Sequence, residues 1–177
     1  VDGDTEPTAE TNKNRGIWPL PGGIYAYVDT LFAALDAVAI SSFKLRDFAR
    51  WFMKTFEQVK SEKTAMGYAN VPRSIGLTKT ENGKVVLTPD GWAIQKRKDK
   101  QTLFGVFSKN ILGVDEIMEF LRTSDEPQKE AEVLSFLKEN LGIEWTTFAQ
   151  VNFRLLWLVN LGKIRRTDKG YDIAAGN

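Results

Sequence analysis

The chain has 177 residues, a net charge of +1, and neither cysteine nor histidine. These two absences exclude disulfide frameworks, zinc ribbons, thiol nucleophiles and every catalytic or metal site that depends on an imidazole. With 42% hydrophobic residues, the chain can build one domain or two small ones. It contains no apolar run long enough to span a bilayer, and it starts with polar, acidic residues. We therefore expect no membrane segment and a cytoplasmic location, or a nuclear one in a eukaryote.

The small net charge is unevenly distributed along the chain. Residues 24–100 contain 13 basic and eight acidic side chains, whereas residues 101–177 contain nine basic and 11 acidic ones. Residues 1–23 are acidic, and up to about residue 15 they show no hydrophobic periodicity. We expect a polar tail with an extended lead-in over residues 1–23, then one domain at 24–100 and another at 101–177. The basic middle of the chain favours a nucleic-acid partner.

The first domain is predicted to begin with three helices. Apolar residues recur at helical spacing over residues 24–40 and again over residues 45–56. Residues 59–75 predict a third helix, and Gly67 and Pro72 within it predict a kink or an early end.

A β-hairpin and a short helix are predicted to complete this domain. Residues 77–87 surround an Asn82-Gly83 pair, which is a strong signal for a tight hairpin turn. Residues 88–94 begin with Thr-Pro, a typical start of a helix. Residues 95–100 carry four cations and predict a solvated basic connector.

The second domain repeats this order. Helical spacing predicts helices over residues 114–121 and 127–141, and a third helix from a cap at Thr146 or Thr147 to a Leu-Gly end at residues 161–162. Residues 163–174 then predict a second hairpin.

Three helices followed by a hairpin within about 75 residues resemble a winged helix, and residues 24–174 contain this order twice. The run from Gln150 to Arg166 resembles a recognition helix that continues into its wing. The Leu-Thr-Pro-Asp-Gly run at residues 87–91 is similar to the wing ending of many winged-helix transcription factors. More loosely, the second copy resembles winged-helix modules of restriction-modification proteins. The resemblance implies a mainly α fold with small β-hairpins, an α+β class, in two consecutive winged-helix domains.

Such domains usually bind double-stranded DNA through the third helix and the wing. On a helical wheel Thr147, Gln150 and Arg154 share one face, where Arg could contact guanine and Gln adenine. The alternative is an ordinary solvated face on which Thr147 caps the helix. Trp157 flanks this face and is expected to pack between the domains. The predicted DNA-binding residues are Lys60, Lys63, Arg73, Lys79, Lys84, Lys96, Arg97, Lys98, Thr147, Gln150, Arg154, Lys163, Arg165 and Arg166.

No catalytic constellation emerges from the sequence. No Asp or Glu is followed two residues later by Lys, as the commonest restriction-nuclease motif requires, and no Walker A pattern occurs. We expect no enzyme activity, no cofactor and no metal. The leading hypothesis is a DNA-binding module of a restriction-modification protein or a transcription regulator. The alternatives are a winged-helix scaffold that binds a protein partner or forms a homodimer, and a plasmid-type replication initiator.

Overall fold

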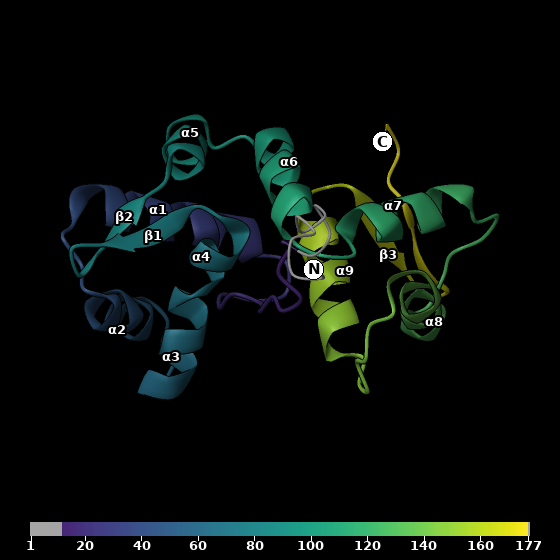
Figure 1. Ribbon diagram of the computed structural model, residues 1–177, viewed down its shortest axis with the longest axis horizontal. Coiled ribbons are helices and arrows are strands. Elements are labelled where there is room, and N and C mark those ends of the chain that lie inside the picture. The colour runs from purple at the N-terminus through teal and green to yellow at the C-terminus, as the bar shows by residue number, and fades with distance from the viewer. Residues whose placement is uncertain (1–11, 177) are drawn as a thin grey trace, which may run out of the picture.

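The computed structural model describes residues 12–176, so most of the predicted polar tail, residues 1–11, lies outside the described residues. The described chain is mostly helical with two small antiparallel hairpins, which confirms the expected α+β class (Figure 1). Two units lie side by side with α6 (Lys100–Asn110) between them. The first unit contains α1 (Tyr27–Ile40), α2 (Leu45–Thr55), α3 (Glu62–Ala69), α4 (Val71–Ile75), β1 (Thr78–Glu81), β2 (Lys84–Leu87) and α5 (Pro89–Arg97). The second unit contains α7 (Val114–Thr123), α8 (Glu130–Leu141), α9 (Ala149–Asn160), β3 (Ile164–Thr167) and β4 (Gly170–Ile173).

Side-chain caps fix where several helices begin. The side chains of Ser61, Thr88 and Asp99 accept hydrogen bonds from backbone N–H groups in the first turns of α3, α5 and α6. Helix α6 is not among the helices predicted from the sequence, although Leu103 and Phe107 bury one of its faces at helical spacing. Within residues 12–176, every helix is too short or too polar to cross a bilayer.

The structure corrects the predicted end of one helix and shows the expected break in another. Helix α5 continues to Arg97 rather than ending at Ile94, and α6 begins at Lys100, so only Lys98 and Asp99 of the predicted connector lie outside a helix. The chain leaves α5 at Lys98, which has a left-handed φ of 49°. The third helix of the first unit is divided at Asn70 into α3 and α4, with Pro72 in the first turn of α4. A break was predicted here, because proline cannot donate the backbone hydrogen bond of a continuous helix.

Both predicted hairpins are present. In the first, Thr78 pairs with Leu87 at the base, and Asn82 and Gly83 form the turn. These two turn residues have φ values of 52° and 77°, as a type I′ turn requires. In the second hairpin Ile164 pairs with Ile173.

The two units repeat the same backbone hydrogen bonds at an offset of 86 residues, the separation of Leu77 and Lys163. The Leu77 N–H donates to the carbonyl of Pro72, and the Lys163 N–H donates to the carbonyl of Leu158. Each of these two residues then accepts from the residue that follows its hairpin, Thr88 or Ala174. The hairpins are therefore joined to the third helices in the same way in both units.

In both units, one residue of a loop also pairs with the hairpin, as a short third strand would. The Val85 N–H donates to the carbonyl of Phe43 in the loop between α1 and α2. In the second unit Tyr171 of β4 exchanges two such hydrogen bonds with Gln128, which lies in the loop between α7 and α8. In both units the second hairpin strand is thus fixed to the chain just before the second helix.

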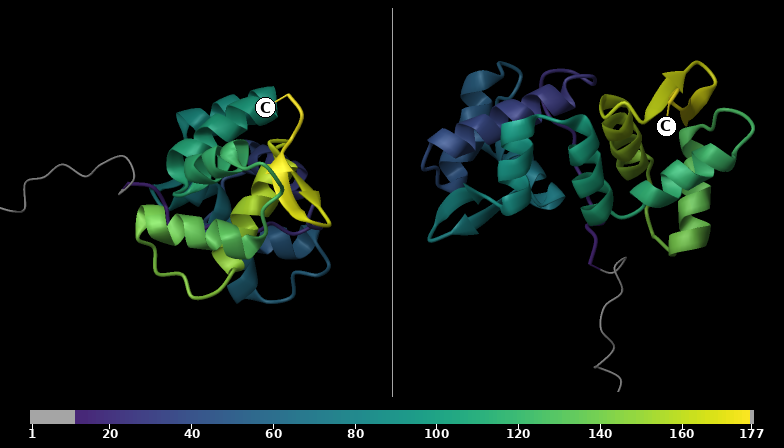
Figure 2. Two further views of the ribbon diagram at one scale, coloured as in Figure 1. Left: turned by 90° about the vertical axis from the view of Figure 1, so that its right-hand side faces the viewer. Right: turned by 90° about the horizontal axis from the view of Figure 1, so that it is seen from above.

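Residues 13–25, here called the lead-in, connect the units. In Figures 1 and 2 this segment passes between them before it reaches α1. Ile17 and Leu20 are buried in it, so it belongs to the core. The Trp18 ring contacts Tyr68 of α3 edge-on, with ring centres 5.9 Å apart, so the lead-in packs on the first unit through this residue.

Candidate nucleic-acid interface

The third helix of the first unit, α3–α4, and the hairpin β1–β2 carry accessible cations. Lys60 is exposed just before α3, Lys63 on α3 and Arg73 on α4. On the hairpin Lys79 is exposed, while Lys84 is half-buried. The structure therefore leaves the predicted cations of this third helix accessible. We call these five residues the first basic surface.

The ion pairs of the first basic surface are weak. The Lys79 ammonium lies 3.2 Å from the Glu81 carboxylate, and both side chains are more than half exposed. The Lys84 ammonium reaches the carbonyl of Ser42 only at 3.5 Å. Exposed pairs of this kind contribute at most about 1 kcal/mol, so an incoming phosphate could replace these contacts.

The connector cations lie elsewhere. Helix α5 is on the opposite side of the first unit from α3 (Figure 1), so Lys96, Arg97 and Lys98 form a separate group. Lys98 donates to Asp36 at 2.7 Å, and this hydrogen bond lowers the pKa of the Asp36 carboxyl. Lys96 lies over the Trp92 ring at 5.8 Å. The structure therefore does not bring the connector together with the first basic surface.

In the second unit, Arg154 is buried and Gln150 is half-buried and bonded within the protein, which corrects the prediction that these two side chains read bases. The Arg154 side chain is fully buried and donates to the carbonyls of Leu112 and Arg15, both at 2.7 Å. It also donates to the Gln150 side-chain oxygen at 2.8 Å, and that oxygen accepts from the Ile17 N–H. These contacts hold α9 against the lead-in, so neither side chain can reach a base edge in this structure.

Arg154 remains a cation in this buried position. Burial lowers its pKa to about 9, which leaves it protonated at neutral pH. The guanidinium lies 4.5 Å from the centre of the Trp145 ring, and this cation–π contact favours the charged form. A buried cation that is bonded to carbonyls on two chain segments fixes the position of α9.

The same face of α9 continues into two further contacts with the N-terminal region. The Trp157 indole donates to the carbonyl of Trp18 at 2.8 Å, in agreement with its predicted packing between the domains. The side chain of Asn160 accepts from the Tyr27 N–H and donates to the carbonyl of Ile24. Asn160 was missed in the sequence. Its helical spacing puts it on the same face as Gln150, Arg154 and Trp157, and this spacing could have indicated a shared role.

Most of the remaining predicted DNA-binding residues of the second unit form hydrogen bonds or ion pairs within the protein. Lys163 is buried, donates to Gln101 at 2.5 Å and lies over the Phe104 ring, so it links β3 to α6. Arg165 forms a two-bond ion pair with Asp172 on the paired strand. Arg166 is exposed at the hairpin surface.

Thr147 is exposed just before α9 and outside the helix, so it is not part of a polar recognition face. The predicted cap at Thr147 is also corrected, because Phe148 occupies the N-cap position and its side chain makes no capping hydrogen bond. The Thr147 hydroxyl accepts only a long contact from the Ala149 N–H, at 3.4 Å. Arg166 is an exposed cation at the hairpin surface, where Tyr171, Tyr25 and Glu130 raise the pKa of its guanidinium.

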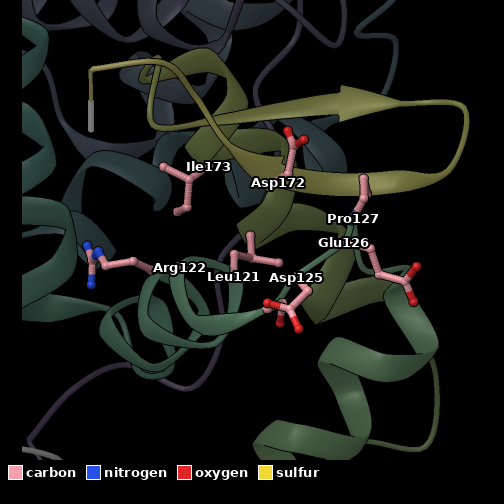
Figure 3. Close-up of a pocket in the computed structure, with 8 residues that line it drawn as sticks. Leu121, Arg122, Asp125, Glu126, Pro127, Asp172 and Ile173 are labelled. Atoms are coloured by element: carbon pink, nitrogen blue, oxygen red, sulfur yellow. The ribbon is translucent and has the colours of Figure 1, made fainter.

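A hollow in the second unit lies between the end of α7 and β4 (Figure 3). Leu121 and Ile173 form its apolar side, and its charged lining residues are Arg122, Asp125, Glu126 and Asp172. Because the carboxylates outnumber the one cation among these lining residues, the hollow does not favour a phosphate group. Within residues 12–176, no group of three or more acidic side chains is close enough to hold a metal ion.

No protein-family model, curated protein or solved structure that was compared with this chain matches it. The candidate site therefore depends on geometry and charge alone. Of the predicted residues, the structure gathers Lys60, Lys63, Arg73, Lys79 and Lys84 on one unit and leaves them accessible. It separates the connector from them and buries the predicted base-reading arginine of α9.

Proposed function

We propose that this chain is a non-catalytic module that binds double-stranded DNA through its first unit. In this proposal each unit is a winged helix, with α3–α4 or α9 as the third helix and a hairpin as the wing. The supporting observations are the repeated hydrogen bonds between helix, hairpin and the loop before the second helix. A DNA-binding role fits a component of a restriction-modification system or a transcription regulator.

The single observation that carries the proposal is the contrast in exposure between the two third helices. Lys63 and Arg73 are exposed on α3 and α4, whereas Arg154 on α9 is fully buried. Contacts to DNA need side chains that can reach phosphates or base edges. The first unit meets this requirement and the second unit acts as its support.

The proposal is tested by measuring the anisotropy of a fluorescent duplex at increasing salt concentration. Reversing Lys63, Arg73 and Lys79 together to Glu should weaken binding by more than about tenfold and flatten the salt dependence. The control reverses three exposed lysines of the second unit, Lys129, Lys138 and Lys169.

Two results would overturn the proposal. One is a wild-type chain that binds no duplex even at low salt. The other is an equal loss of affinity in the two triple variants. Reversal of Lys96 and Arg97 is a third arm, and a loss of affinity confined to it would move the interface to α5.

A second function, binding of a protein partner by the second unit, is favoured by a different observation. Phe120 of α7 and Phe136 of α8 stack at 4.4 Å and remain partly exposed. They lie in a hollow with Glu132 and Glu139. Light scattering with and without duplex separates the two functions, because a stable homodimer that ignores DNA would favour the scaffold.

A further inference from the structure

Two arginines of α2 converge on one carboxylate at the start of α3. Arg46 and Arg50 are one helical turn apart, and their guanidinium groups lie 3.6 Å and 3.5 Å from the same oxygen of Glu62. None of the three residues was among the predicted contacts. The two arginines lie on α2, and Glu62 begins α3, the helix that carries Lys63 of the first basic surface.

This three-residue cluster is weakly held. The side chains of Arg46, Arg50 and Glu62 are 65%, 46% and 58% exposed, so all three stay hydrated. Both distances exceed the roughly 2.7–2.9 Å of a charge-assisted hydrogen bond, so both guanidinium groups keep donors for another acceptor. Exposed pairs of this kind contribute little to stability, and Glu62 can leave at small cost.

The surroundings favour an anion between the two arginines. Residues 44–63 contain six Lys or Arg residues and three Asp or Glu residues. The cluster rims a small hollow of about 200 Å³ whose other lining residues are Ala49, Met53 and Met66. Apolar walls strengthen the field of the charges above them. A tetrahedral phosphate can accept bonds from both guanidinium groups, since the planar fork of arginine matches phosphate oxygens.

The second unit lacks this cluster at the corresponding place. The loop contacts of Phe43 and Gln128 with the hairpins align α2 with α8. With that alignment Ala131 and Ser135 take the places of Arg46 and Arg50, and the buried faces of the two helices also coincide. A general requirement of the fold therefore does not explain the arginine pair.

We propose that Arg46 and Arg50 form a phosphate site for the DNA backbone, and that Glu62 occupies it in the free chain as a competing carboxylate. This inference rests on the proposed DNA binding of the first unit. Duplex binding displaces Glu62, so the carboxylate lowers non-specific affinity until a phosphate is well placed.

The test compares Glu62→Gln with Glu57→Gln in the duplex anisotropy assay. Glu57 is also exposed and loses the same charge, but it has no ion pair with these arginines among the described contacts. Glu62→Gln should tighten binding about threefold to tenfold, whereas Glu57→Gln should change it by less than about twofold. Equal effects of the two substitutions would overturn the proposal.

A double-variant cycle tests the role of the arginines. Arg46→Ala with Arg50→Ala should weaken binding about tenfold, and Glu62→Gln added to that pair should have no further effect. Persistence of the Glu62→Gln effect without the arginines would overturn the proposal. Thermal melts of all variants check the fold, and their midpoints should stay close to that of the wild type because the three side chains are exposed.

Two controls separate this inference from its alternatives. If the wild-type chain binds no duplex, the proposed function fails as a whole. If it binds duplex and Glu62→Gln behaves like Glu57→Gln, this inference alone fails. Inorganic phosphate, titrated by NMR of the arginine side chains, distinguishes the sources of the anion. Saturation below about 1 mM would assign the site to a small phosphate ligand and overturn the assignment to the DNA backbone.

Discussion

The third helices of the two units occupy the same place in their folds and have different surroundings. Both lead into a hairpin through a left-handed glycine, Gly76 in the first unit and Gly162 in the second. Both also contact the lead-in, at positions that are equivalent under the 86-residue offset. Tyr68 meets the Trp18 ring there, and Arg154 donates to lead-in carbonyls.

The difference lies in how much of each helix these contacts cover. Around α3 and α4 the lead-in contributes the Trp18 ring and one hydrogen bond from the Asn14 side chain to the Ser74 carbonyl, and most cations of the first basic surface stay exposed. Along α9 the contacts run over three helical turns, through the side chains of Gln150, Arg154, Trp157 and Asn160. One copy of a repeated fold can therefore keep an accessible face because the other holds the two units together.

The largest expected effect on this contrast comes from Arg154→Ala. The substitution leaves the carbonyls of Leu112 and Arg15 without a donor and opens a cavity between the units. We expect a loss of about 3–5 kcal/mol in the free energy of unfolding, measured by urea denaturation. Arg165→Ala is the control, since this exposed cation should cost less than about 1 kcal/mol. Similar losses for the two variants would contradict a structural role of Arg154.

A smaller loss of stability should distinguish alanine substitutions at Asn160 and Ser74. These two residues are equivalent under the 86-residue offset. Asn160→Ala removes the acceptor of the buried Tyr27 N–H and should cost about 1–3 kcal/mol. The Ser74 hydroxyl bonds only within its own helix, to the carbonyl of Asn70, so Ser74→Ala should cost well under about 1 kcal/mol. Denaturation curves of the two variants measure the difference. Equal costs would show that the lead-in does not bind α9 more firmly than α3–α4.

Gly67 tests how closely the lead-in packs on α3. A Cβ at this position would lie 2.2 Å from the Trp18 ring, so Gly67→Ala should displace the ring and cost about 1 kcal/mol. Gly105 on α6 has open space at its Cβ position, and Gly105→Ala should instead stabilise the chain by about 0.5–1 kcal/mol. Melting temperatures and the tryptophan emission of Trp18 report the two outcomes. Unchanged emission in Gly67→Ala would show that the ring does not depend on this glycine.

The sequence predicted most elements and missed what joins them. Hydrophobic periodicity and turn residues were sufficient to predict both hairpins and the kink before Pro72, because these features depend on residues that are neighbours in the sequence. The burial of Arg154 depends on carbonyls about 140 residues away in the chain, at Asn14 and Arg15. No local pattern contains such a contact. The helical wheel correctly placed Gln150 and Arg154 on one face of the helix. However, polar residues that bond to backbone carbonyls have the same helical spacing in the sequence as polar residues that face water.

The smallest expected effect concerns the two hairpins. Arg165 and Asp172 face each other across β3 and β4, and the equivalent pair in the first hairpin is Lys79 and Val86. The hydrogen bond from Arg165 lowers the pKa of the Asp172 carboxyl below its ordinary value of 3.8. A lowered pKa in the folded state stabilises the fold above pH 3.8, and this stabilisation is lost as the pH falls through the lowered pKa.

Asp172→Asn should therefore lower the melting temperature slightly at pH 7, by the small amount expected of an exposed ion pair. The difference from the wild type should shrink as the pH falls below 3.8, because protonation removes the same charge from Asp172 in the wild type. Lys79→Ala in the first hairpin, where the cation faces a valine, should show no such pH dependence beyond that of its Glu81 neighbour. A melting-temperature difference for Asp172→Asn that stays constant down to pH 2 would mean that the second hairpin holds Arg165 no more tightly than the first holds Lys79. The Arg165 cation would then be as available to a phosphate as Lys79.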